Sequence, residues 1–149
     1  MTDFKGNILI VEDEALVAAN YSDHLEPLGY HCRIVNNVAQ ALTIIKMESF
    51  NLLICDHDLP DGKGIDLITA LRNLGWKTPV CYLSAAQNTV LKEIQDLAEI
   101  SVVLSKPVDK EDLCKAVEEN ALDEIPNQPS CINTKEREML SKVFPFCKS

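Results

Sequence analysis

The stretch NILIVEDE, residues 7–14, indicates the fold class of this chain. Its apolar residues, 8–11, are followed at once by the acidic Glu12 and Asp13. A short continuous apolar run of this kind is typical of a strand covered on both faces, as in a parallel sheet. Open parallel sheets bind ligands beyond the carboxyl ends of their strands. The stretch therefore predicts an α/β fold with an acidic group at one edge of the sheet.

The same alternation of apolar run and helical stripe recurs along the chain. Each apolar run precedes a stretch in which apolar residues return at helical spacing, which indicates βαβ units and a parallel sheet. Right-handed crossovers on both faces give a doubly wound five-stranded sheet, for which 2-1-3-4-5 is one of two common strand orders. The expected strands are residues 7–11, 31–35, 52–55, 80–83 and 101–104.

The helical stripes predict the core. The first stripe ends at Gly29, the second is preceded by Asn37 with Gln40 as a capping pair, and the fifth begins at Asp109. The expected core residues are Leu16, Val17, Tyr21, Leu25 and Leu28; Val38, Ala41, Leu42 and Ile45; Leu67, Ile68, Leu71 and Leu74; Val90, Leu91, Ile94 and Leu97; and Leu113 and Val117.

Composition and charge indicate a soluble domain with an acidic body. The 149 residues are 46% hydrophobic and 25% charged, which suits one compact domain with a short appendage. The formal net charge of -9 lies wholly in residues 1–122, because residues 123–149 hold four acidic and four basic side chains. An acidic body without a basic patch repels nucleic acid phosphates and anionic membranes. We therefore expect neither as a direct partner.

The six cysteines are not spaced as metal ligands, since no two form a CxxC pair. Several lie in apolar runs, among them Cys55 and Cys81, where a reduced thiol behaves as a small hydrophobe. The first residues hold no apolar stretch long enough for a signal peptide or a membrane span. These features predict a cytoplasmic protein with inert core thiols.

Acidic residues follow two of the expected strands. Glu12 and Asp13 follow the first strand, and Asp56 follows the third. Because these strands are neighbours in the proposed order, the three carboxyl groups should share one small pocket. Like charges so close raise one another's pKa unless a cation offsets them, and carboxylate oxygens of this kind suit Mg²⁺. The sequence predicts an Mg²⁺ site here, with a solvated acidic loop as the alternative.

Polar residues also follow the fourth and fifth strands. The hydroxyl of Ser84 can donate to one phosphoryl oxygen, while the ammonium of Lys106 supplies positive charge to another. Either residue alone would be ordinary at a strand end. Together with Asp56 as a nucleophile beside a metal site, they indicate a carboxylate that becomes phosphorylated.

The assembled set of strand-end residues is Glu12-Asp13, Asp56, Ser84 and Lys106-Pro107. It closely resembles the receiver domain of bacterial two-component response regulators, over residues 7–120. The loop Leu59-Pro60-Asp61-Gly62 matches the loop that follows the third strand in that family. The resemblance implies a flavodoxin-like (βα)5 fold over residues 1–122 and a phosphoacceptor signalling domain, not an enzyme. Its partner would be a sensor histidine kinase or a histidine phosphotransfer protein, and its phosphorylated form would bind a partner or form a homodimer.

The resemblance also implies a role for each residue of the transfer step. Asp56 resembles the phosphoacceptor. Lys106 resembles the lysine that pairs first with the acceptor and then with the phosphoryl group. Ser84 resembles the switch hydroxyl that is drawn in once phosphate arrives. The isomer of the Lys106–Pro107 bond stays open, because sequence cannot show it.

The metal ligands follow from the same resemblance. Asp13 and Asp56 would bind Mg²⁺ directly with the backbone carbonyl of Asp58, and Glu12 would act through a bound water. Residues two after the acceptor and two after the hydroxyl modulate phosphoryl lifetime in the family, and here they are Asp58 and Ala86. The Asp58 carboxylate could repel a polyanionic partner or orient an attacking water. In either case Asp58→Asn should change the dephosphorylation rate.

One position departs from the family pattern. An aromatic residue often lies three positions before the lysine, where its rotation couples phosphorylation to the surface around the fourth helix and fifth strand. Here the residue is Val103, which has no ring to rotate. Tyr82, two residues before Ser84, is a candidate substitute, although a tyrosine inside a strand is also an ordinary core residue.

Residues 123–149 lie outside the resemblance. Residues 126–129, Pro-Asn-Gln-Pro, indicate a linker, and Asn133 with Glu136 indicates a capping box that opens a short helix. Residues 134–140 faintly resemble the start of a LuxR-type DNA-binding domain. We expect a stand-alone regulator with a docking tail, with the receiver half of a truncated DNA-binding transcriptional regulator as the alternative.

Two further functions could use the same residue types. A Mg²⁺-dependent phosphohydrolase with an aspartyl nucleophile could use these carboxylates, but the chain has no insert that would cap such an active site. A nucleotide-binding domain would need a phosphate-binding glycine motif, and residues 62–64, Gly-Lys-Gly, match neither a P-loop nor a dinucleotide fingerprint. The phosphoacceptor is therefore the first prediction.

Overall fold

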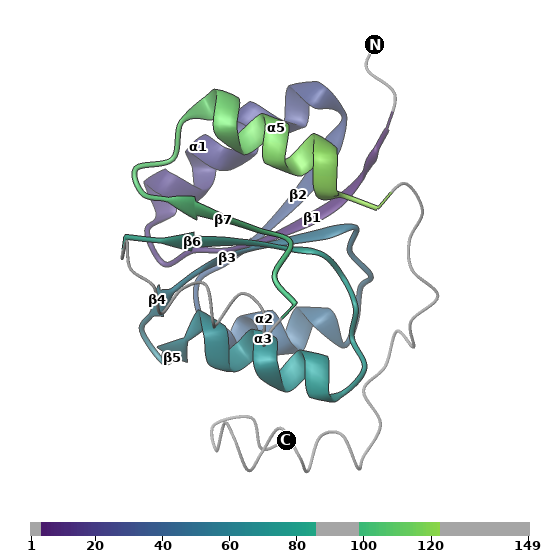
Figure 1. Cartoon of the computed structure of the whole chain (residues 1–149), viewed down its shortest axis with the longest axis vertical. Helices are drawn as coiled ribbons and strands as arrows, with labels where there is room; N and C mark the ends of the chain where they lie inside the picture. The colour runs from purple at the N-terminus through teal and green to yellow at the C-terminus, as the bar shows by residue number, and fades with distance from the viewer. Residues whose placement is uncertain (1–3, 86–98, 123–149) are drawn as a thin grey trace.

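A five-stranded parallel sheet forms the centre of the molecule (Figure 1). The computed structural model describes residues 4–85 and 99–122. The sheet strands are β1 (Gly6–Val11), β2 (Tyr30–Val35), β3 (Leu52–Asp56), β6 (Val80–Ser84) and β7 (Val102–Ser105). They run in the order β2-β1-β3-β6-β7. Counted over the sheet strands alone, this is the order 2-1-3-4-5, so the predicted fold is confirmed.

Helices cover both faces of the sheet. Figure 1 shows α1 and α5 on one face and α2 and α3 on the other. The helices are α1 (Ala15–Leu25), which continues into the 3-10 turn η1 (Glu26–Leu28), α2 (Val38–Ile45), α3 (Gly64–Asn73) and α5 (Lys110–Asn120). A separate apolar core lies on each face of the sheet, and every residue of β3 is buried between them. The strands β4 (Asp58–Leu59) and β5 (Gly62–Lys63) form a short antiparallel hairpin within the segment that was expected to be a loop.

Capping residues and a glycine mark the ends of several helices. The Asn37 side chain accepts a hydrogen bond from the Gln40 N–H at 2.8 Å, and Gln40 Oε1 accepts one from the Asn36 N–H at 2.9 Å. The turn after α1 ends at Gly29, whose φ of 107° lies in the left-handed region that favours glycine. Asp109 is the N-cap of α5, as expected, but its side chain makes no capping hydrogen bond.

The predicted core of α1 is wrong at Leu16, whose side chain is 83% exposed. With 3.6 residues per turn, Leu16 lies about 140° around the helix from Tyr21, so the two side chains cannot both face the sheet. Leu28 falls in the 3-10 turn and is only partly buried. The buried residues of α1 are Ala18, Tyr21, Ser22 and Leu25. The expected core residues of α2 and α5 are all buried, and in α3 Leu74 alone is partly exposed.

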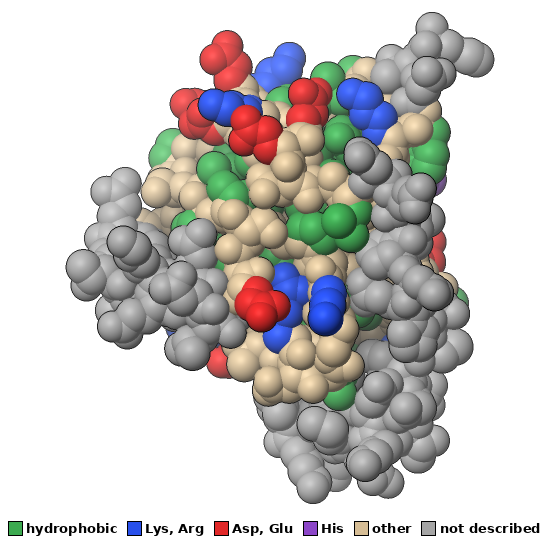
Figure 2. All heavy atoms as spheres, turned by 45° about the vertical axis from the view of Figure 1, so that its right-hand side comes forward, with side chains coloured by type: hydrophobic (Ala, Val, Ile, Leu, Met, Phe, Trp, Pro, Cys, Tyr) green, Lys and Arg blue, Asp and Glu red, His purple; other side chains and the backbone are tan. Residues whose placement is uncertain are grey.

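Several predictions fall outside the described residues. These are the helical stripe that begins at Val90, the position Ala86, and residues 123–149 with their expected linker and short helix. Within the described residues the cysteines are free thiols, namely Cys32, Cys55, Cys81 and Cys114. No helix in the described ranges is long and apolar enough to cross a membrane. On the face seen in Figure 2, acidic and basic side chains of the described residues are interleaved.

Candidate functional site: a carboxylate cluster beside a lysine

The carboxyl ends of four strands meet at one edge of the sheet. Asp56 pairs with Leu83 of β6, and Ser84 pairs with Ser105 of β7. Glu12 directly follows β1, the neighbour of β3 on its other side. Parallel pairing therefore brings together residues that lie far apart in the sequence.

Three carboxyl groups form a cluster at this edge. One oxygen atom from each of Glu12, Asp13 and Asp56 lies within 4.8 Å of the others. Glu12 is fully buried and Asp56 is 4% exposed, whereas Asp13 faces solvent. Oxygen atoms at this spacing fit a hard cation that keeps several waters, as Mg²⁺ does.

Lys106 reaches the cluster from the end of β7. Its Nζ atom lies 2.8 Å from Asp56 Oδ1 and 3.2 Å from Glu12 Oε2. Three ionised carboxylates and one ammonium leave two negative charges without a partner inside the cluster. A divalent cation would balance them.

Burial and charge shift the pKa of two groups in the site. Burial raises the pKa of Glu12 above its ordinary value, and the charge of Asp56 raises it further, while Lys106 acts in the opposite direction. Burial lowers the pKa of Lys106, but its hydrogen bond to Asp56 and the charges of Asp56 and Glu12 outweigh this and raise it. Lys106 is therefore cationic at neutral pH, and burial makes ionisation of Glu12 less favourable than it is in water.

Backbone hydrogen bonds hold the strand ends in place. The N–H of His57 donates to the carbonyl of Leu83 at 2.9 Å, and the N–H of Lys106 donates to that of Ser84 at 3.0 Å. The Lys106–Pro107 peptide bond is cis, which settles the isomer that the sequence leaves open. The residues on either side of the cluster are thus fixed by the sheet itself.

Two structural contacts beside β3 were not predicted from the sequence. The Asp61 carboxylate accepts hydrogen bonds from the N–H groups of Val38 at 2.8 Å and Ala39 at 3.0 Å, so the hairpin loop caps α2. At Gly64 an added Cβ would lie 2.2 Å from the carbonyl oxygen of Asp56, so a side chain there would collide with the backbone of β3. Neither contact could be predicted from a local sequence pattern, because each joins segments that only the fold brings together.

A third missed contact involves the residue after Asp56. His57 hydrogen-bonds through Nδ1 to the hydroxyl of Tyr82, and the two rings meet edge to face. Tyr82 is fully buried, and burial is the main cause of its raised pKa. Val103, where the family often has an aromatic residue, is partly buried against the core on the α2–α3 face. Tyr82 therefore contacts the residue next to Asp56, whereas Val103 has no ring.

The remaining predicted site residues differ in burial. Ser84 is 2% exposed, one position beyond the residue that pairs with Asp56. The side chain of Asp58 is 78% exposed and its Oδ1 lies 3.9 Å from Lys63 Nζ. Asp58 therefore keeps its carboxylate in solvent at the rim of the site, and the role of its backbone carbonyl stays a prediction.

This geometry can be compared with that of known proteins. Residues 8–118 match the family described as response regulator receiver domain. The chain belongs to this family. The receiver is therefore a domain of two-component signalling, as the strand-end residues predicted.

Curated relatives extend the comparison. The receiver is 32% identical over 108 residues to the transcriptional regulatory protein CrdR of Helicobacter pylori, covering 71% of this chain and 50% of CrdR. It is 31% identical over 103 residues to the sensor histidine kinase RcsC of Escherichia coli K12, covering 68% of this chain and 11% of RcsC. The chain thus spans half or less of the length of these relatives.

Solved structures share the fold. The receiver domain of the Francisella response regulator 1452 has 25% sequence identity and a TM-score of 0.72, covering 76% of this chain and 93% of that one. A putative response regulator from Chloroflexus aurantiacus has 28% identity and a TM-score of 0.71, covering 76% of this chain and 95% of that one. The sheet order and the family match therefore agree.

Proposed function

We propose that this receiver accepts a phosphoryl group on Asp56 from the phosphohistidine of a sensor kinase or a histidine phosphotransfer protein. The observation that carries the proposal is the buried Asp56 carboxylate, 2.8 Å from the Lys106 ammonium and inside a cluster of acids. A carboxylate can act as a nucleophile, and fixed positive charge stabilises the negative charge of a transferred phosphoryl group.

The proposed step is a direct displacement at phosphorus. An oxygen of Asp56 attacks, an O–P bond forms, and the N–P bond to the donor imidazole breaks. The electron pair stays on the imidazole nitrogen, which takes up a proton. Lys106 then turns from the carboxylate to a phosphoryl oxygen, and the Ser84 hydroxyl donates to another.

The residues present fit a magnesium ion. Asp13 and Asp56 would bind it directly with the backbone carbonyl of Asp58, and Glu12 would hold one of its waters. When bound, Mg²⁺ would offset the negative charge that gathers on the transferred group. The two uncompensated charges of the cluster support this assignment.

The output of the switch belongs to the same proposal. The phosphorylated receiver, residues 1–122, would expose or reshape a surface that binds a partner or a second copy, through a two-state element biased by the new bonds. Residues 123–149 would act as a linker and a short helix. The protein would work in the cytoplasm as an acceptor and not as an enzyme, and this chain would bind neither nucleic acid directly nor a membrane.

Intact mass after incubation with acetyl phosphate tests this function. The native chain should gain one phosphoryl group with Mg²⁺ and none with a chelator. Asp56→Asn should gain none, whereas Asp66→Asn, which changes an exposed aspartate of α3, should behave as the native chain. Uptake by Asp56→Asn equal to the native level would refute the assignment. Rapid release of phosphate from many small esters would favour a phosphohydrolase instead.

A further inference from the structure

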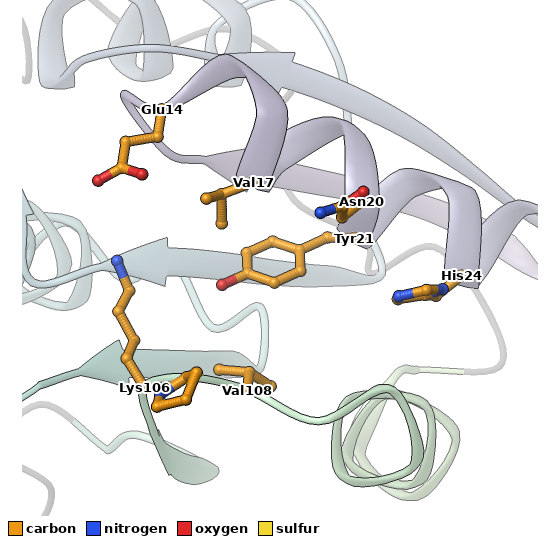
Figure 3. A pocket seen from close by; sticks show the side chains of 8 residues that line it. Glu14, Val17, Asn20, Tyr21, His24, Lys106 and Val108 are labelled. Atoms are coloured by element: carbon orange, nitrogen blue, oxygen red, sulfur yellow. The ribbon is translucent and has the colours of Figure 1, made fainter.

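A pocket of about 460 Å³ lies between α1 and the segment that follows β7. Val17, Tyr21 and His24 of α1 line one side, and Lys106, Pro107 and Val108 line the other (Figure 3). Lys106 also contacts the carboxylate cluster, so one end of the pocket is the candidate site itself.

Tyr21 is the buried polar side chain of this pocket. It is 6% exposed, and Figure 3 shows its ring extending from α1 with the hydroxyl at the end nearer Lys106. Within residues 4–85 and 99–122, this hydroxyl forms no hydrogen bond with another residue. A buried hydroxyl without a partner lowers stability, so such groups are rarely left unpaired. The pocket therefore presents a hydroxyl that is available to a group at its inner end.

Lys106 has a matching free donor. An ammonium carries three N–H groups, and two of them serve Asp56 Oδ1 and Glu12 Oε2. No other acceptor among the described residues contacts Nζ, although Lys106 also lines the pocket. The hydroxyl of Tyr21 can accept the third N–H through one bridging water.

Burial is the main reason why the Tyr21 hydroxyl stays neutral. Burial, the largest cause, and the charge of Glu12 raise the pKa of Tyr21 to about 12, although Lys106 acts in the opposite direction. A protonated phenol can accept a hydrogen bond from the ammonium without adding negative charge to an acidic site. It can thus steady Lys106 without competing with Asp56.

We propose that Tyr21 is a positioning residue, whose hydroxyl holds the Lys106 ammonium from the pocket side through a bridging water while the lysine turns from Asp56 to the phosphoryl group. The role in transfer rests on the proposed function, because Lys106 must move when Asp56 gains a phosphoryl group. The hold on Lys106 before transfer does not depend on it.

Tyr21→Phe tests whether the Tyr21 hydroxyl holds the Lys106 ammonium, since it removes one oxygen and keeps the ring. The readout is the exchange of the Lys106 ammonium protons with water, followed by ¹⁵N NMR in the unphosphorylated full chain and assigned by the loss of the signal in Lys106→Arg. Exchange should be about fivefold faster in Tyr21→Phe, as the loss of one modest hydrogen bond predicts. Equal exchange in the two proteins would overturn the proposal.

The matched control is Tyr30→Phe. Tyr30 is 7% exposed and begins β2, at the opposite edge of the sheet from the carboxylate cluster. This variant should leave the Lys106 exchange rate unchanged, and an equal acceleration would mean that Tyr21 acts only through general packing.

Phosphorylation by acetyl phosphate with Mg²⁺ then separates the two proposals. Tyr21→Phe should slow the uptake about fivefold, whereas Tyr30→Phe should not. If the native chain takes up no phosphoryl group on Asp56, the proposed function fails, while the NMR exchange still decides whether Tyr21 holds Lys106. Normal uptake by Tyr21→Phe would remove its role in transfer.

Discussion

At the residue scale, the site depends on one lysine that balances two buried carboxylates. Lys106→Met would leave Glu12 and Asp56 without their cation, and breaking a buried pair costs about 3–5 kcal/mol. Because the Lys106 side chain is 25% exposed, we expect a loss near the lower end, about 3 kcal/mol, in the free energy of unfolding without Mg²⁺. Urea denaturation measures this loss.

The control for that prediction is the exposed pair of Lys63 and Asp58, 3.9 Å apart. Lys63→Met should cost less than about 1 kcal/mol, as is usual for solvent-exposed ion pairs. Equal losses in the two lysine variants would mean that Lys106 has no special place in the structure.

Glu12 gives a pH prediction whose sign follows from its raised pKa. The folded protein binds a proton at Glu12 more readily than the unfolded chain does, so ionised Glu12 lowers stability at pH 7. Glu12→Gln, which mimics the protonated form, should therefore raise the free energy of unfolding at pH 7 without Mg²⁺. This gain in the free energy of unfolding should shrink as the pH falls toward 4.5, the ordinary pKa of a glutamate side chain. Urea titrations at several pH values would contradict this account if the gain were constant or grew on acidification.

At the element scale, the strands were the most predictable features. Each expected sheet strand agrees with the observed one to within a residue at either end. The fully buried strands β3 and β6 were the clearest, because such strands read as continuous apolar runs. The α1 stripe was less reliable, since Leu16 is apolar but lies on the exposed side of the helix. Apolar residues on an exposed face look the same in sequence as those on the buried face.

The cap on α2 shows what local patterns omit. Asn37 was expected to cap this helix and does so. In addition, both carboxylate oxygens of Asp61, in the hairpin after β3, accept hydrogen bonds from the first N–H groups of the helix. Its partners are the first N–H groups of α2, which no residue nearby in sequence satisfies. Such a contact depends on the packing of the hairpin against α2, so the sequence alone could not indicate it.

Removing this cap should loosen one helix. Asp61→Ala should lower the free energy of unfolding by about 1 kcal/mol, a common cost for a lost helix cap. It should also speed hydrogen exchange at the N–H groups of Val38 and Ala39, because these groups donate their hydrogen bonds to the Asp61 carboxylate. Asp23→Ala, an exposed change on α1, is the control and should do neither. Unchanged exchange at Val38 and Ala39 would show that the cap does not hold α2.

At the scale of the whole molecule, the site was predictable because parallel strands end at one edge. The expected strand order alone predicted that Glu12, Asp13 and Asp56 lie close together. In the structure one carboxylate oxygen from each lies within 4.8 Å of the others. The hydrogen bond of Tyr82 and the place of Tyr21 on the pocket wall were not predictable. Both residues fit the pattern of ordinary core, and only the packed structure shows which groups their hydroxyls face.

Magnesium should stabilise the whole domain through the acidic cluster. A ligand present at 100 times its dissociation constant adds about 2.7 kcal/mol to the free energy of unfolding. The Tm of the native chain should therefore rise with Mg²⁺ concentration, whereas that of Asp13→Asn should rise much less. Asp66→Asn should keep the native response. A native Tm that does not respond to millimolar Mg²⁺ would contradict the metal site.

The most direct test of the central claim is chemical mapping of the phosphorylated residue. Borohydride reduces an aspartyl phosphate to homoserine, so peptide mass spectrometry of the treated, phosphorylated chain locates the acceptor. We predict homoserine at position 56, formed only after incubation with acetyl phosphate and Mg²⁺. Homoserine at another aspartate, with position 56 unchanged, would contradict the account.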